Sequence, residues 1–378
     1  MVKYDLMKLF RGKLLTFSSV ASGVFFFCAL LFITKTPPNN TILPTITSRT
    51  PTLTTVPVKK EPLPLSKTLH NEYHIFQTFN NCGPASLSMA LSYYNIHITQ
   101  EILGQNLRPY QNPQGDNDDK SVTLNELAEE AKKYDLIPYH RPHGNIETLK
   151  AFIANDMPII TRTWLHENED IGHYRVVKGY DDSTHELIQD DSFQNKNLRF
   201  SYDSFNTIWK KFNYEYLVLV PKEKQTIARE ILGENVDENI AWRNALTSVQ
   251  EELKRNPDDV YARFNLVVTA YHTGDYTRAT QEYEKIQTRL PSRTLWYQIE
   301  PIQAYAAINN TERVFSLTDK ILQNGNRAFS ELYLIRGDIY KKQGDLVSAQ
   351  REYENAYAYN KSMEEANEKY TQIDTARE

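Results

Sequence analysis

Cys82 lies in a sequence context that suits a reactive thiol. It sits in the run Asn-Asn-Cys-Gly-Pro-Ala-Ser, and the apolar residues after it have the spacing of a helix with one buried face, at Leu87, Ala90, Leu91 and Tyr94. We therefore expect a helix that begins near Cys82, with Pro84 in its first turn and Asn80 or Asn81 as its cap. Free N–H groups and the helix dipole would stabilise a thiolate there, and the thiolate is the nucleophilic form of cysteine.

His173 is the candidate base for this thiol, because such a base is distant in sequence and near in space. It begins the β-rich run His-Tyr-Arg-Val-Val-Lys-Gly-Tyr-Asp-Asp, which leads into a predicted turn at Asp181–Thr184. The return strand, residues 186–189, ends in Asp190-Asp191. A carboxylate can therefore emerge beside the first strand and orient the imidazole.

Gln77 is the candidate for stabilising an oxyanion, since it lies five residues before Cys82 and carries a side-chain N–H. Each candidate also admits a structural interpretation. A free cysteine is often buried and inert, a histidine at a strand start can fill a polar gap, and a loop glutamine is usually solvated. The order of Gln77, Cys82, His173 and Asp190 favours the catalytic interpretation.

Metal ions, cofactors and nucleic acids are not predicted as ligands. The formal net charge of −5 gives no general basic field of the kind that attracts nucleic acid. Three further histidines lack the spacing of a standard zinc site, and one acidic run lacks the alternating acids of a calcium loop. These are His140, His143 and His166, and the run Asp116–Asp119.

The motifs resemble the bacteriocin-processing (double-glycine) cysteine peptidase family and its papain-like relatives. The resemblance covers about residues 66–222 and rests on a glutamine before Asn-Asn-Cys-Gly-Pro-Ala-Ser, on Gly-His-Tyr-x-Val-Val-x-Gly-Tyr-Asp-Asp, and on Ile-Gln-Asp. It implies that Gln77 lines the oxyanion hole, that Cys82 attacks, and that His173 acts as base and then as acid. It also implies that Asp190 orients the histidine, with the neighbouring aspartate as the alternative. The chain has no Walker motif, so the leader-peptide specificity of transporter-linked members is not implied.

The remainder of residues 67–222 fits an α+β, papain-like domain in which a helical lobe packs on an antiparallel sheet. Helical spacing covers residues 121–134, where Thr123 and Glu126 have the pattern of a capping box, and residues 146–155. Strands are predicted at residues 158–164, 175–179, 187–188 and 216–220. We expect the cysteine helix and the histidine strand to meet at a cleft.

Residues 223–378 change to pairs of helices with a spacing of 35 residues, marked by turns at Gly274-Asp275, Asn309-Asn310 and Gly344-Asp345. The pattern resembles tetratricopeptide repeats, with flanking helices at residues 240–255 and 363–373. Such repeats stack into an all-α solenoid, whose concave side usually binds an extended peptide or another protein. We expect a protein partner or the substrate to bind there, and a purely structural or dimerising solenoid is the alternative.

Residues 14–34 predict a single transmembrane helix, because they carry no charge over about the length that spans a bilayer. Basic residues precede this segment, at Lys3, Lys8, Arg11 and Lys13, and the positive-inside bias places residues 1–13 in the cytoplasm. A cleaved signal peptide is the alternative, although no A-x-A-like site is present. Residues 35–66 are rich in Pro and Thr and predict a linker outside the cell.

The sequence therefore predicts a membrane-anchored cysteine peptidase outside a bacterial cytoplasmic membrane, acting on a peptide or protein substrate. An unpaired thiol in an exported domain is liable to oxidation, so its presence there favours a chemical role. Two alternatives remain open. One is a peptidase-like binding or scaffold protein without turnover, and the other is an amidase or transferase that acts on cell-wall peptides through the same acyl-enzyme.

Overall fold

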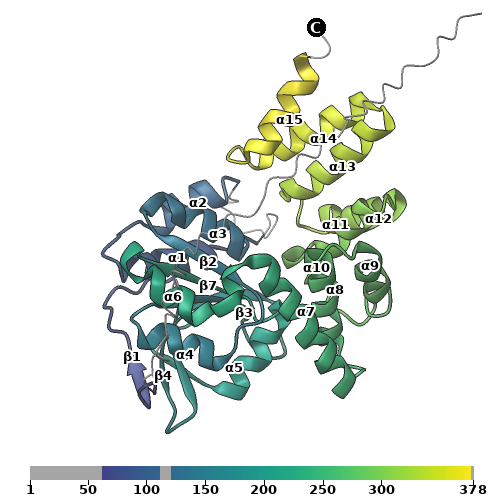
Figure 1. Cartoon of the computed structure of the whole chain (residues 1–378). Helices are drawn as coiled ribbons and strands as arrows, with labels where there is room; N and C mark the ends of the chain where they lie inside the picture. The colour runs from purple at the N-terminus through teal and green to yellow at the C-terminus, as the bar shows by residue number, and fades with distance from the viewer. Residues whose placement is uncertain (1–61, 111–120, 376–378) are drawn as a thin grey trace, which may run out of the picture. The chain divides into compact units, whose positions relative to one another are not determined.

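The computed structural model of the chain describes residues 62–110 and 121–375 (Figure 1). These described residues belong to a single compact unit, which contains an α+β domain and the helices that follow it. Among the described residues, none of the helices combines the length and the apolar character needed to cross a bilayer. The predicted membrane segment, residues 14–34, and nearly all of the predicted linker lie outside the described residues. Both stay predictions.

An antiparallel sheet forms the centre of the α+β domain. In the described part of the chain it has seven strands in the order β2-β7-β3-β4-β5-β6, and β1 pairs with the end of β4. The strands are β1 Ser66–Thr68, β2 Ile137–Arg141, β3 Ile159–Trp164, β4 Gly172–Asp181, β5 Glu186–Asp191, β6 Leu198–Ser201 and β7 Tyr216–Val220. The predicted hairpin is confirmed, because β4 and β5 are consecutive antiparallel partners. The start of β4 and the end of β5 therefore lie side by side.

Helices cover both faces of this sheet (Figure 1). Helices α1 to α3 share a core with Ile160 and Val176, whereas α4 to α6 share a core with Ile159 and Val177. Successive residues of a strand point to opposite faces, so each central strand contributes to both cores. The helices are α1 Cys82–Ser92, α2 Gln100–Leu107, α3 Leu124–Ala131, α4 Ile146–Ala154, α5 Tyr202–Trp209 and α6 Gln225–Leu232. The sequence predicted one helical lobe, and the structure has a helical layer on each face.

Capping side chains mark where helices of this domain begin. Thr123 and Glu126 form the predicted capping box at the start of α3, and Asn145 accepts a hydrogen bond from the N–H of Thr148 at the start of α4. Each side chain satisfies an N–H that has no partner within the helix. The core of the domain continues beyond residue 222, because α6 packs among the strands through Ala228.

Helices α7 to α15 form the repeat region. They are α7 Glu238–Arg255, α8 Val260–His272, α9 Tyr276–Glu284, α10 Thr294–Tyr297, α11 Glu300–Ala307, α12 Thr311–Gln323, α13 Ser330–Gln343, α14 Leu346–Tyr359 and α15 Glu364–Thr375. The three predicted turns join α8 to α9, α11 to α12 and α13 to α14. In each turn the second residue caps the next helix, at Asp275, Asn310 and Asp345. The 35-residue spacing is therefore a spacing of helical pairs.

Helices α13 and α14 approach each other closely at Gly337. A Cβ atom at this position would lie 2.4 Å from the ring of Tyr353 on the partner helix. We expect Gly337→Ala to lower the free energy of unfolding by about 1–3 kcal/mol, because the buried ring must shift. Denaturant unfolding measures the effect. The control Lys341→Ala changes an exposed residue of the same helix and is expected to be neutral, and equal effects of the two changes would contradict the packing argument.

Candidate active site

Cys82 is the first residue of α1, as the sequence predicts. Asn81 occupies the N-cap position, but its side chain does not cap the helix. It instead donates to Thr78 Oγ1 at 2.8 Å and accepts from Arg108 Nη1 at 2.6 Å. Asn80 has a left-handed φ of 56°, so the chain turns sharply just before the thiol. The whole of α1 is buried rather than one face of it, because α2, α3 and the sheet surround it.

His173 connects the thiol to a carboxylate. Its Nε2 lies 2.9 Å from Oδ1 of Asp191, and the imidazole also lies near the Cys82 thiol, so that the two groups shift each other's pKa. Since Nε2 is taken by Asp191, Nδ1 is the ring nitrogen left for the thiol. The other carboxylate oxygen of Asp191 lies 3.1 Å from Nε of Arg175. The three residues Cys82, His173 and Asp191 are only 7, 3 and 0% exposed, so water screens their interactions weakly.

A β-bulge decides which aspartate reaches the histidine. Next to the turn, Asp181 of β4 pairs with Glu186 of β5. If the ladder continued from there without a shift, Val177 would pair with Asp190. Alternation would then place Asp190 on the face of His173. The register shifts between Val177 and Gly179, however, so that Arg175 pairs with Asp191 instead. Residues 173 and 175 share a face, and Asp191 joins them.

Asp190 therefore does not orient His173, contrary to the sequence-based expectation. It faces the other side of the sheet, where its Oδ1 lies 2.7 Å from Nζ of Lys178 and accepts from the N–H of Asn197 at 2.9 Å. Lys178 is the extra residue at the bulge. The pair is buried, so Asp190 balances a buried charge away from the thiol.

The thiol and the imidazole shift each other's pKa. Burial raises the pKa of Cys82, but the hydrogen bond and charge of His173, helped by the charges of Arg108 and Arg162, outweigh burial and hold the pKa below its usual value. Burial lowers the pKa of His173, but hydrogen bonds to Asp191 and Cys82 raise it above its usual value overall. Both shifts act in the direction of a thiolate beside an imidazolium.

Asp191 supplies the fixed negative charge of this arrangement. Burial raises its pKa, but the hydrogen bond and charge of His173 and the charge of Arg175 lower it to about 2. Burial lowers the pKa of Arg175 to about 10, which leaves the guanidinium charged at neutral pH. Arg175 is itself held by Thr163 Oγ1 and by the carbonyls of Trp164 and Leu165. The carboxylate thus stays ionised and in place.

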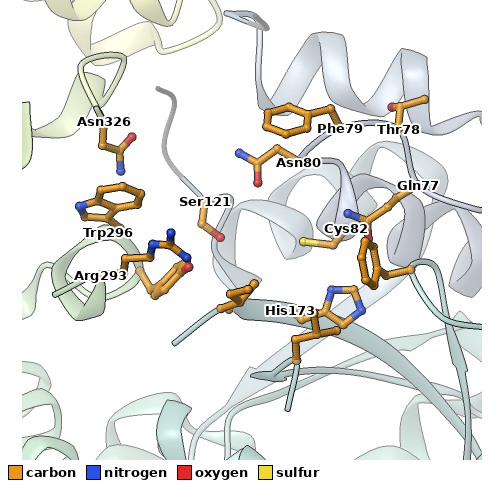
Figure 2. A pocket seen from close by; sticks show the side chains of 15 residues that line it. Gln77, Thr78, Phe79, Asn80, Cys82, Ser121, His173, Arg293, Trp296 and Asn326 are labelled. Carbon is orange, nitrogen blue, oxygen red and sulfur yellow. The ribbon is translucent and has the colours of Figure 1, made fainter. Parts of the chain in front are cut away.

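Gln77 lies beside Cys82 with its amide held in one orientation. Its backbone N–H donates to the carbonyl of Ser192 at 2.8 Å, and Ser192 Oγ donates to Gln77 Oε1 at 2.9 Å. With Oε1 engaged, the amide NH₂ is directed to the side of the thiol, as Figure 2 shows. A donor in this place is suited to a negative charge on an oxygen that reacts at Cys82.

A cleft of about 330 Å³ opens over these residues (Figure 2). Cys82, His173 and Gln77 line it, together with the apolar side chains of Phe79 and Phe193, which are 51 and 59% exposed. The ring of Phe193 meets the ring of His173 edge to face, with centroids 6.3 Å apart. The side chains that carry chemistry therefore lie at the floor of an apolar cleft.

Residues 64–217 match the family model described as Peptidase_C39 like. Residues 241–293 match the model of the tetratricopeptide repeat. The chain therefore carries a C39-like domain followed by tetratricopeptide repeats. No curated protein matches the chain.

Solved structures resemble one part of the chain or the other. A putative C39-like peptidase from Bacillus anthracis is 18% identical, with 42% of this chain and 98% of that one covered, at a TM-score of 0.34. The peptidase domain of Streptococcus ComA is 22% identical, with 40% of this chain and 100% of that domain covered, at a TM-score of 0.32. ComA is a bi-functional ABC transporter involved in a quorum-sensing pathway. A thermophilic TPR protein from Thermus thermophilus is 22% identical, with 39% of this chain and 79% of that one covered, at a TM-score of 0.31.

Sequence reasoning missed several residues of the site in the C39-like domain. Asp191 was considered only as the alternative, and Ser192 and Arg175 were not considered. Alternation along β4 would have placed Arg175 on the face of His173, but no sequence signal marks the bulge that brings Asp191 to that face. Within the described ranges, no group of three or more His, Cys, Asp or Glu side chains is placed to hold a metal ion.

Asp191→Asn tests the role of the charge, because it keeps the shape of the side chain and removes the carboxylate. The pKa of His173 should fall, since the carboxylate raises it, and the pKa of Cys82 should rise, since a neutral imidazole stabilises the thiolate less. We expect the onset of rapid alkylation of Cys82 by iodoacetamide to move to higher pH, because the thiolate then forms only at higher pH. The alkylation rate as a function of pH measures this.

Asp190→Asn is the matched control. It leaves Lys178 buried without its partner and should lower stability, but it should leave the pH range of alkylation as in the unaltered protein. An onset that moves to higher pH for Asp190→Asn and stays unchanged for Asp191→Asn would contradict the assignment.

Proposed function

We propose that the chain is a cysteine peptidase, in which Cys82 is the nucleophile, His173 the base and then the acid, and Asp191 the residue that orients His173. The observation that carries the proposal is the buried series of contacts from the thiol through His173 to Asp191, at the floor of a cleft. A cysteine used only for packing does not need a hydrogen-bonded imidazole and a fixed carboxylate. The match to the C39-like family model supports the same conclusion.

The proposed reaction has two halves. The Cys82 thiolate attacks the carbonyl carbon of a peptide bond, and the negative charge on the oxygen is met by the amide of Gln77 and by N–H groups at the start of α1. His173 gives its proton to the departing amine, which leaves an acyl group on the sulfur. Water then attacks this thioester with His173 as base, releasing the acid and restoring the thiolate and imidazolium.

Peptide hydrolysis is the direct test of this proposal. We expect the purified full-length protein to cleave a library of peptides, and we expect Cys82→Ala to lose cleavage completely. His173→Ala should lose cleavage and should also slow the alkylation of Cys82 at neutral pH, because burial then raises the pKa of the thiol without opposition from the imidazolium. The chain has two cysteines, so Cys82→Ala also measures the background labelling of Cys28.

Two further variants separate catalysis from thiol reactivity. Gln77→Ala should lower kcat by about a hundredfold, as for the loss of one oxyanion donor, while leaving alkylation unchanged. His166→Ala changes an exposed histidine and should alter neither. Rapid alkylation of Cys82 without cleavage of any peptide would favour a binding protein that has no turnover.

The same proposal places the C39-like domain and the repeats outside the cytoplasmic membrane, anchored by residues 14–34. It is supported by the uncharged run and by the basic residues that precede it. Protease added to intact cells should degrade the repeats and spare a tag fused to residue 1. If the repeats are protected in intact cells and degraded after lysis, the proposed orientation is wrong.

A further inference from the structure

The repeat region lines the same cleft as the candidate catalytic residues. The lining residues of the cleft that contains Cys82 and His173 include four side chains from the segments around α10 and before α13, namely Arg293, Trp296, Tyr297 and Asn326. Figure 2 shows Trp296 and Asn326 on the side of the cleft opposite Cys82. A peptide that reaches the thiol therefore also meets the repeats.

Tyr297 holds this part of the repeats against the strand that carries His173. Its hydroxyl donates to the carbonyl of Asp170 at 3.2 Å, and its own carbonyl accepts from Arg162 Nη1 at 3.1 Å. A Cβ atom at Gly172 would lie 2.9 Å from the tyrosine ring, so only a glycine allows this approach beside His173. The repeat residues are thus placed next to the reacting groups by specific contacts.

Asn326 is the residue that indicates that a ligand binds here. Its side chain is fully buried, and within the described residues neither its amide oxygen nor its amide nitrogen has a hydrogen-bond partner. Leaving a buried amide unpaired costs roughly 1–3 kcal/mol, so such groups are rare unless something else pairs with them. One acceptor and a pair of donors on one planar group match the N–H and C=O of a peptide unit.

Trp296 supplies an apolar surface next to this amide. The indole is partly exposed, and its face is flanked by the guanidinium of Arg293, which lies 5.6 Å from the ring centroid. Arg293 is itself engaged with Asp170 at 3.8 Å, so its charge is partly balanced. An aromatic face between a polar anchor and a balanced charge is suited to an apolar side chain.

We propose that Trp296 and Asn326 form a substrate subsite, in which an extended peptide pairs one main-chain amide with Asn326 and rests an apolar side chain on Trp296. The inference builds on the proposed peptidase activity and adds the substrate class and the residues that select it. The repeats then act inside the catalytic cleft and not only as a distant recruiting surface. Specificity follows from the main chain and one apolar residue, without a terminal carboxylate.

The test measures binding separately from cleavage. Full-length Cys82→Ala, which cannot turn over substrate, is immobilised and incubated with random peptides capped at both ends, and the bound peptides are quantified by mass spectrometry. We expect retention of peptides enriched in an apolar residue at one position. Adding Asn326→Leu should reduce retention about tenfold, the loss expected when a peptide amide loses its partners on binding. Adding Trp296→Ala should remove the apolar preference.

Asn324→Leu is the matched control, because it changes an exposed asparagine two positions away and should leave retention unchanged. Thermal unfolding separates a structural role, since replacing a buried unpaired amide by an apolar group should leave stability equal or higher. Unchanged retention with Asn326→Leu, or no retained peptide at all, overturns the subsite. Retention that depends on Asn326 in a protein whose active form cleaves nothing upholds the subsite and refutes the peptidase proposal.

Discussion

The lowered pKa of the Cys82 thiol is linked to a buried hydrogen bond of 2.9 Å between His173 Nε2 and Asp191 Oδ1. Removing charges from water costs several kcal/mol per ion unless each finds a partner. Here the partners form a series, because the carboxylate lies between the imidazole and the guanidinium of Arg175. In such surroundings an opposite charge acts more strongly than in water, which is why the pKa of the thiol falls although burial alone would raise it.

The sheet makes this series of charges possible. β4 carries His173 and Arg175, and β5 brings Asp191 to the same face only because the ladder shifts at Val177–Gly179. Helical layers on both faces keep water away from the strands, and α1 brings the thiol to the imidazole from one of those layers. The fold thus serves the site in two ways: it fixes the directions of these side chains, and it lowers the local dielectric around them.

The repeats are connected to the site through Arg162. This side chain lies over the ring of Tyr297, donates to its carbonyl, and contributes to lowering the pKa of Cys82. The sequence suggested a solenoid that binds a protein partner or the substrate on its concave side, and it did not place the repeats at the cleft. In the structure α10 reaches the cleft itself, so a change in the repeats can alter both what enters the cleft and the charge around the thiol.

The sequence alone determined what depends on short-range patterns. The order of Gln77, Cys82 and His173, the helix that starts at the thiol, the hairpin after His173 and the 35-residue spacing all follow from local periodicity, turns and motifs. Tertiary structure decided the rest. A one-residue bulge exchanged Asp190 for Asp191, because a shift of one residue moves a side chain to the opposite face and leaves no mark in composition. Burial of all of α1, and the arrival of Trp296 and Asn326 in the cleft, result from packing between segments far apart in sequence, which no local pattern encodes.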